Sequence, residues 1–243
     1  MWLVAGGPGD GLGGAVAAGA PLVSNRLYQD YERLETAFTG IEGSLEAGRK
    51  RLLELAQMAD YYGQPFQDIA KGYRDMAYSF RGTDLESQIM SVYDGMVANV
   101  TSVGEDPATL KSIQTALAKV AANSRTYGDE INQLVDAGLS RSFMAEALDM
   151  SLDEFNKKLR SEAGIAADVF VPAIAELMKE RSKIGGALDD RRKSTQAEQA
   201  RAANTALYAN VFANRQGLDK YSREFYIALR NMFVNMQPLL EEI

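Results

Sequence analysis

Hydrophobic side chains recur every three or four positions after the first two dozen residues, the spacing of an α-helix that buries one face. A clear example runs from Leu45 to Ala59, and Gly63 follows where a glycine commonly ends a helix in the left-handed conformation. Pro65 suits the first turn of the next helix, whose apolar positions continue to Phe80. The pattern therefore predicts consecutive helices separated by short turns.

Capping signals predict where further helices begin. Thr83 and Glu86 have the spacing of a capping box, and the apolar face that follows them ends at Gly104. Asp106 and Pro107 form an N-cap followed by a first-turn proline. Each signal stands directly before a stretch of helical periodicity, which favours a helix at both places.

A cluster of short helical segments lies between residues 131 and 159, where Ser151 and Glu154 form another capping box. No run of strictly alternating apolar and polar residues bounded by turn residues occurs in the sequence. The predicted fold class is all-α, a compact multi-helix bundle of short helices followed by a long C-terminal helix.

The last quarter of the chain has a different character. Gly185 and Gly186, followed by charged residues 189–193, predict a hinge or solvated turn, and Thr195 with Glu198 starts another helix. Apolar residues then follow steps close to the heptad of a coiled coil. They form a candidate self-association seam, namely Leu218, Tyr221, Phe225, Leu229, Met232, Met236 and Leu239. Burial of the seam against the protein's own core is the open alternative.

Three segments are expected. Residues 1–24 contain seven glycines, two prolines and no positive charge, which predicts a flexible Gly/Ala-rich arm, or else a small-residue surface that packs on another helix. Residues 25–184 are expected to form a helical domain, and residues 185–243 a hinge and long C-terminal helix.

Composition limits the chemistry. The chain has no cysteine and no histidine, which excludes disulfides, thiolate metal sites, Cys-His pairs and Ser-His-Asp triads. The remaining carboxylate pairs, such as Asp129-Glu130, stand at helix starts or in polar runs, so we expect no enzyme, no metal site and no cofactor. The formal net charge of −7 disfavours binding to nucleic acid or to anionic membranes.

Residues 129–160 have the pattern of a helix-turn-helix unit, with short helices, a glycine turn and Ser151-Leu152 before the second helix. That helix begins with Asp153 and Glu154, which would face DNA phosphates. From residue 126 to residue 165 there are four basic and eight acidic side chains, a net charge of −4. We therefore expect no sequence-specific DNA binding.

Several segments occur in a recognisable order. A Thr39-Gly40 turn precedes an Ala/Leu-rich helix, and Pro65-Phe66 opens a second helix. An eleven-residue motif follows later in the chain, Gly128-Asp129-Glu130-Ile131-Asn132-Gln133-Leu134-Val135-Asp136-Ala137-Gly138. In form and order, residues 27–212 resemble the tape-measure domain of tail tape measure proteins from tailed bacteriophages. Leu139-Ser140 departs from the Ile-Pro that many members carry, and Asp149 stands where glycine is frequent.

The resemblance implies a structural role, because tape measure proteins lie within the tail tube, set tail length during assembly and leave the particle ahead of the DNA. It implies a fragment of a phage or prophage protein, located in the tail lumen of the virion and in the host cytoplasm during assembly. The implied partners are other copies of the chain and tail tube or tail tip proteins, with membrane contact only during infection. Two alternatives stay open, a helix-turn-helix regulator using residues 129–160 and a helical adaptor or chaperone.

Overall fold

The computed structural model describes residues 16–104, 107–161 and 163–214, and most of them are helical. The all-α fold class predicted from the sequence is confirmed. The described residues form, in order, α1 (Val16–Glu42), α2 (Leu45–Tyr62), α3 (Phe66–Phe80), η1 (Glu86–Gln88), α4 (Ile89–Val103), α5 (Pro107–Ala122), β1 (Arg125–Thr126), α6 (Gly128–Asp136), α7 (Arg141–Ala147), α8 (Leu152–Arg160), β2 (Ile165–Ala166), α9 (Ala167–Ser182), η2 (Ile184–Gly186), α10 (Ala187–Arg192) and α11 (Thr195–Asn214).

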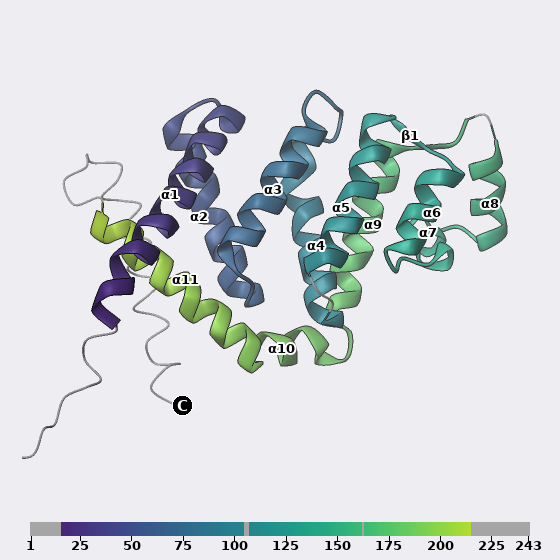
Figure 1. Ribbon diagram of the computed structural model, residues 1–243. Helices are drawn as coiled ribbons and strands as arrows, with labels where there is room; N and C mark the ends of the chain where they lie inside the picture. Colours follow the sequence, from purple (N-terminus) through teal and green to yellow (C-terminus); the bar gives the residue numbers. More distant parts are fainter. Residues whose placement is uncertain (1–15, 105–106, 162, 215–243) are drawn as a thin grey trace, which may run out of the picture.

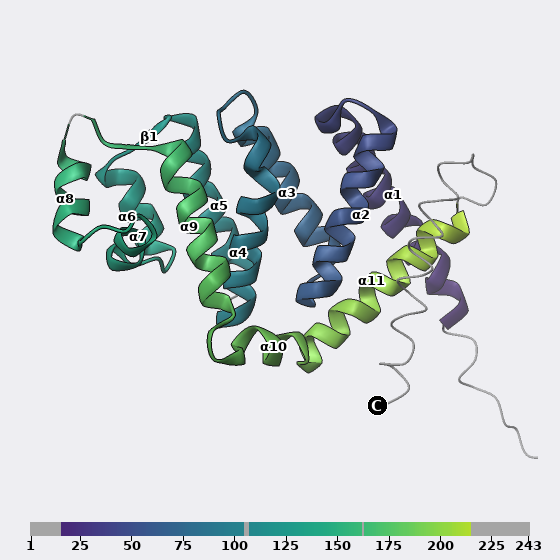
Figure 2. The ribbon, with the colours of Figure 1, turned by 180° about the vertical axis from the view of Figure 1, so that it is seen from behind.

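The helices are arranged as a row. Figure 1 shows α1 and α2 at one end, then α3, then α4, α5 and α9, with the short helices α6, α7 and α8 at the other end. Seen from behind in Figure 2, α10 and α11 run along one edge of the row, from the foot of α9 back to α1 and α2. We call α10 and α11 the C-terminal strap (residues 187–214).

The core runs continuously through the row. The most extensive helix contact joins α4 and α9, where Gly95 lies against the backbone carbonyl of Ala175. Phe170, Val171 and other apolar side chains of α9 are fully buried, as are most of those on α4. The buried hydroxyl of Tyr93 donates to the backbone oxygen of Ile69 over 2.9 Å, so α4 and α3 are also joined by a satisfied polar contact.

Several predicted helix ends are confirmed. Gly63 and Gly104 end α2 and α4 in the left-handed region, at φ 63° and 71°. A side chain at Gly63 would also collide with Ala197 of the strap. Glycine at this position therefore allows both the left-handed turn and the close packing of the strap against the end of α2. The capping box of Ser151 and Glu154 is present at the start of α8.

The predicted capping box of Thr83 and Glu86 is wrong, because the α-helix begins only at Ile89. The carboxylate of Glu86 instead accepts a hydrogen bond from the backbone N–H of Gly82 over 2.8 Å, and the Thr83 hydroxyl accepts one from the N–H of Leu85 over 3.3 Å. Leu85 is buried, which draws this segment into a tight turn before the helix.

Helices occur within two of the expected segments, the arm and the hinge. Residues 1–15 of the predicted arm lie outside the described residues, but α1 begins at Val16, because the alanine-rich end of that segment runs directly into the helical pattern. The predicted hinge contains α10, where Leu188 is buried and Arg192 contacts α2. The glycines before it, Gly185 and Gly186, both have positive φ and form the turn. The domain division itself stays a prediction.

Candidate functional site

The motif of the family resemblance lies in the part of the molecule formed by residues 125–166, which we call the lobe. Its two ends are joined by the antiparallel strands β1 and β2, with Arg125 opposite Ala166 and Thr126 opposite Ile165. The guanidinium of Arg125 also donates to the backbone oxygen of Ala163. The chain therefore leaves the row and returns to it at one point, beside α5 and α9. Strands of two residues are too short to give an alternating pattern, so the sequence did not predict them.

The motif residues hold α6 in place. Leu134 is fully buried, and Gly138 has a φ of 95°, which lets the chain turn after the helix. The side-chain oxygen of Gln133 accepts a hydrogen bond from the Lys119 amine of α5 over 2.7 Å. That of Asn132 accepts one from Arg141 of α7 over 2.8 Å. The polar residues of the motif thus connect the helix to its two neighbours.

Helices α7 and α8 are fixed in the same way. Arg141 also donates to the side-chain oxygen of Asn156 over 3.0 Å, so one guanidinium bridges α6 and α8. Asp149, between α7 and α8, has a φ of 52°, a conformation that favours glycine. The resemblance places glycine frequently at this position. Arg141 is the kind of basic residue that a DNA-binding unit would need on its surface, but its guanidinium is engaged in contacts within the lobe.

The exposed start of α8 is acidic. Glu154 accepts hydrogen bonds from both the hydroxyl and the backbone N–H of Ser151, and these donors lower the pKa of its carboxyl group. Asp153 lies 3.5 Å from the amine of Lys157. In a helix-turn-helix protein the first turn of this helix approaches DNA, and two carboxylates there would repel phosphates.

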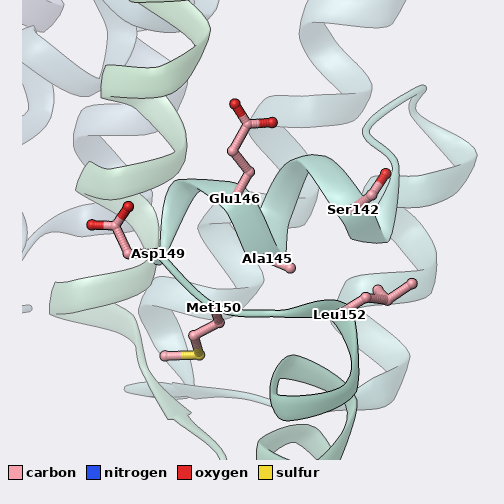
Figure 3. Close-up of a pocket in the computed structure, with 6 residues that line it drawn as sticks. All are labelled: Ser142, Ala145, Glu146, Asp149, Met150 and Leu152. Carbon is pink, nitrogen blue, oxygen red and sulfur yellow. The ribbon is translucent and has the colours of Figure 1, made fainter.

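A shallow hollow of about 410 Å³ lies on the lobe, open to solvent and lined by residues of α7 and the start of α8. Figure 3 shows that Ser142, Glu146 and Asp149 point in different directions and do not converge on one point. Glu146 is paired with Arg181 of α9. A catalytic pair needs both groups within reach of one reacting atom, and these three side chains do not provide that geometry.

A polar cluster between the strap and the turn that joins α2 to α3 was not predicted from the sequence. It lies towards the end of the row opposite the lobe. Asn204 of the strap is buried, and its side-chain amide donates to Asp60 Oδ1 and to the backbone oxygen of Gln64, each over 3.0 Å. Its side-chain oxygen accepts from the backbone N–H of Phe66 over 2.8 Å. The spacing of Asn204 with Leu207, Tyr208 and Val211 on one helix face is the signal that could have placed it at an interface.

Two arginines complete this cluster. Arg201 donates to the backbone oxygen of Asp60 over 2.9 Å, and Arg192 donates to that of Tyr61 over 2.7 Å. The Arg192 guanidinium also lies 3.8 Å from the centre of the Tyr61 ring, within the range of a cation–π contact. The strap thus supplies donors for carbonyl groups at the C-terminal end of α2.

The electrostatics of this cluster centre on Asp60. Burial raises its pKa to about 6, although Asn204 and Arg201 act in the opposite direction. Burial, with the nearby Asp60 carboxyl, also raises the pKa of Tyr208 well above its ordinary value. Neither Asp60 Oδ2 nor the Tyr208 hydroxyl has a hydrogen-bond partner, although both are buried.

The predicted self-association seam, from Leu218 to Leu239, lies outside the described residues. Within the described ranges, carboxylate side chains do not gather in groups of three or more that could hold a metal ion. Among the same residues, no helix is both long and apolar enough to cross a lipid bilayer.

No protein-family model matches the chain, and no curated protein or solved structure is similar enough to it to count as a match. Function therefore has to be inferred from the residues and contacts described above.

Proposed function

We propose that the chain is a structural, non-enzymatic protein of a phage or prophage tail, a tail tape measure protein that acts in tail assembly, tail length determination and genome delivery. The observation that carries the proposal is the order of segments from Thr39-Gly40 through Pro65-Phe66 to the motif at residues 128–138. The predicted turn at Thr39-Gly40 is wrong, because both residues lie inside α1 and the chain turns at Gly43 and Ser44 instead. The motif adds weight because its polar residues connect three helices, a role that requires those residue types.

The proposed partners are other copies of the chain and tail tube or tail tip proteins. The apolar seam at residues 218–239 would provide the contact, because a helix with so wide an apolar stripe is poorly soluble unless the stripe is covered. The proposed location is the tail lumen of the virion, with the host cytoplasm during assembly and a membrane only at infection.

Tail length tests the proposed function directly. We would duplicate residues 218–238 in frame in the phage that carries the gene and measure tails by electron cryomicroscopy. Twenty-one extra helical residues should lengthen every tail by about 30 Å, since a helix rises about 1.5 Å per residue. A recoded gene with an unchanged protein sequence is the control. Normal tail length in particles that contain the duplicated protein would refute a ruler function.

The seam has its own test in the purified protein. Phe225→Asp with Leu229→Asp should lower the oligomer mass in light scattering while the far-ultraviolet circular dichroism stays helical. Arg230→Asp, on the polar side of the same segment, is the control and should leave the mass unchanged. A loss of thermal stability with no change in mass would mean that the seam packs on the protein's own core.

A further inference from the structure

The C-terminal strap packs on α4 through α10 and on α1 through α11, and it also makes a set of polar contacts to one turn. Arg192, Arg201 and Asn204 all bind backbone groups or Asp60 in the segment from Asp60 to Phe66, which joins α2 to α3. Most of these partners are carbonyl and N–H groups at helix ends, which water can satisfy equally well after the strap leaves. This polar part of the attachment can therefore be exchanged for water.

The apolar part of this interface is formed by Leu188 of α10 and by a few side chains of α11, and the Tyr208 ring also lies against the Phe66 ring. Ala197, Leu207, Tyr208 and Val211 are the hydrophobic side chains that α11 buries among its described residues. The strap joins α9 through Gly185 and Gly186, where an added side chain would meet nothing within 4 Å. A turn of two unobstructed glycines can change its backbone angles without moving α9.

The same interface contains two polar atoms without partners, Asp60 Oδ2 and the Tyr208 hydroxyl. The titratable groups that face Asp60 are Arg201 and Tyr208 of α11, with Glu198 paired to Arg201, and Tyr31 of α1 lies next to Tyr208. An ionised Asp60 therefore keeps one carboxylate oxygen buried without a donor, which is costly. A neutral Asp60 lowers that cost, because a buried neutral carboxyl group without a partner costs less than a buried carboxylate, and water removes the cost when the strap opens.

We propose that the C-terminal strap detaches reversibly from the row by rotation about Gly185 and Gly186. Ionisation of Asp60 shifts the equilibrium from the attached, closed state towards the detached, open state. This inference does not depend on the proposed tail function. It assigns to Asn204 and Asp60 the role of holding the strap in the closed state. It also predicts that the surface covered by α11 becomes accessible to solvent while the row stays folded.

The direction of the effect follows from proton linkage. The pKa of Asp60 is about 6 in the closed state and would return towards 3.8 in water. The closed state therefore binds the proton more tightly, and closure is lost as the pH rises from the open-state pKa through the closed-state pKa. Between about pH 5 and pH 7.5, the ratio of open to closed strap should rise about tenfold.

Thiol accessibility in the full chain measures this ratio, because the sequence has no cysteine of its own. Val211→Cys places a buried thiol on α11, and Val97→Cys places a matched one on α4 in the core of the row. Both would react with a pyridyl disulfide reagent at each pH, with rates divided by those of a free thiol. We expect the corrected rate at residue 211 to rise about tenfold between about pH 5 and pH 7.5, and that at residue 97 to stay constant.

The carboxyl group is tested by Asp60→Asn in the Val211→Cys background, with the exposed Asp84→Asn as the control. Asp60→Asn should abolish the pH dependence, and Asp84→Asn should keep it. As a second variant, Asn204→Asp should raise the accessibility of residue 211 at neutral pH. Circular dichroism confirms that each variant stays folded. A flat profile in the parent protein, an equal rise at residue 97, or an unchanged profile in Asp60→Asn would each overturn the proposal.

Discussion

Gly95 allows a sharp test of the packing between α4 and α9. In an exposed helix, replacing glycine by alanine stabilises the folded state by about 1 kcal/mol, because alanine has the higher helix propensity. At Gly95, the added Cβ would lie 2.2 Å from the backbone oxygen of Ala175 and 2.8 Å from its carbonyl carbon. Since these are backbone atoms of a helix, no side-chain rotation can relieve the overlap.

The size of the effect follows from these distances. A carbon atom and a carbonyl oxygen come no closer than about 3.3 Å, so α4 and α9 would have to separate by about 1 Å. A gap of that size forfeits roughly a quarter to a half of the dispersion energy of each contact across the interface. Overpacking of a core costs about 1–3 kcal/mol, and the gain in helix propensity offsets part of it. We expect Gly95→Ala to lower the free energy of unfolding by about 1–2 kcal/mol.

Urea denaturation followed by circular dichroism measures this change, with equal slopes for the two proteins as the condition for comparing midpoints. Gly40→Ala is the matched control, because Gly40 lies in α1 and an added Cβ there would meet nothing within 4 Å. We expect it to raise the free energy of unfolding by about 0.5–1 kcal/mol. If Gly95→Ala is as stable as Gly40→Ala, the two helices do not approach as closely as described.

Three further predictions concern the lobe and the strap. Ser151→Ala should lower the free energy of unfolding by about 1 kcal/mol, because the hydroxyl caps α8. Ser112→Ala, at an exposed position of α5, should change it by less than about 0.5 kcal/mol in the same assay. The full chain should not bind duplex DNA specifically, and a sequence-dependent dissociation constant below about 1 µM at physiological salt in an anisotropy titration would contradict this. Limited trypsin digestion should cut first near residues 185–193. First cuts within residues 45–120, with Arg191-Arg192-Lys193 intact, would contradict that boundary.

The sequence predicted those parts of the fold that local chemistry determines. Gly63 and Gly104 end their helices because the left-handed conformation is easiest for glycine, and Ser151 with Glu154 caps α8 through atoms only three residues apart. The same reasoning failed at Thr83 and Glu86, although this pair has the spacing of a capping box. There the N–H of Gly82 binds Glu86, and the burial of Leu85 tightens the turn.

The strap and its polar cluster were not predictable, because they depend on residues far apart in the sequence. Asn204 binds groups near residue 60, about 140 positions earlier, and a single sequence contains no signal for such a pairing. The hinge prediction counted Arg192 among solvated charges, yet its guanidinium lies over the Tyr61 ring. The lobe was recognised as a cluster of short helices, but the strands that close it were not.

The contact between α4 and α9 also determines when the chain can fold during synthesis. Gly95 and Ala175 touch, although they lie 80 positions apart in the sequence. At about 5–20 residues per second, a ribosome needs roughly 4–16 s to make the intervening chain. Throughout that interval the face of α4 around Gly95 has no partner, and the lobe, which ends at residue 166, is completed only shortly before Ala175. The nascent chain is therefore most open to aggregation, and most dependent on chaperones, in the seconds before α9 emerges.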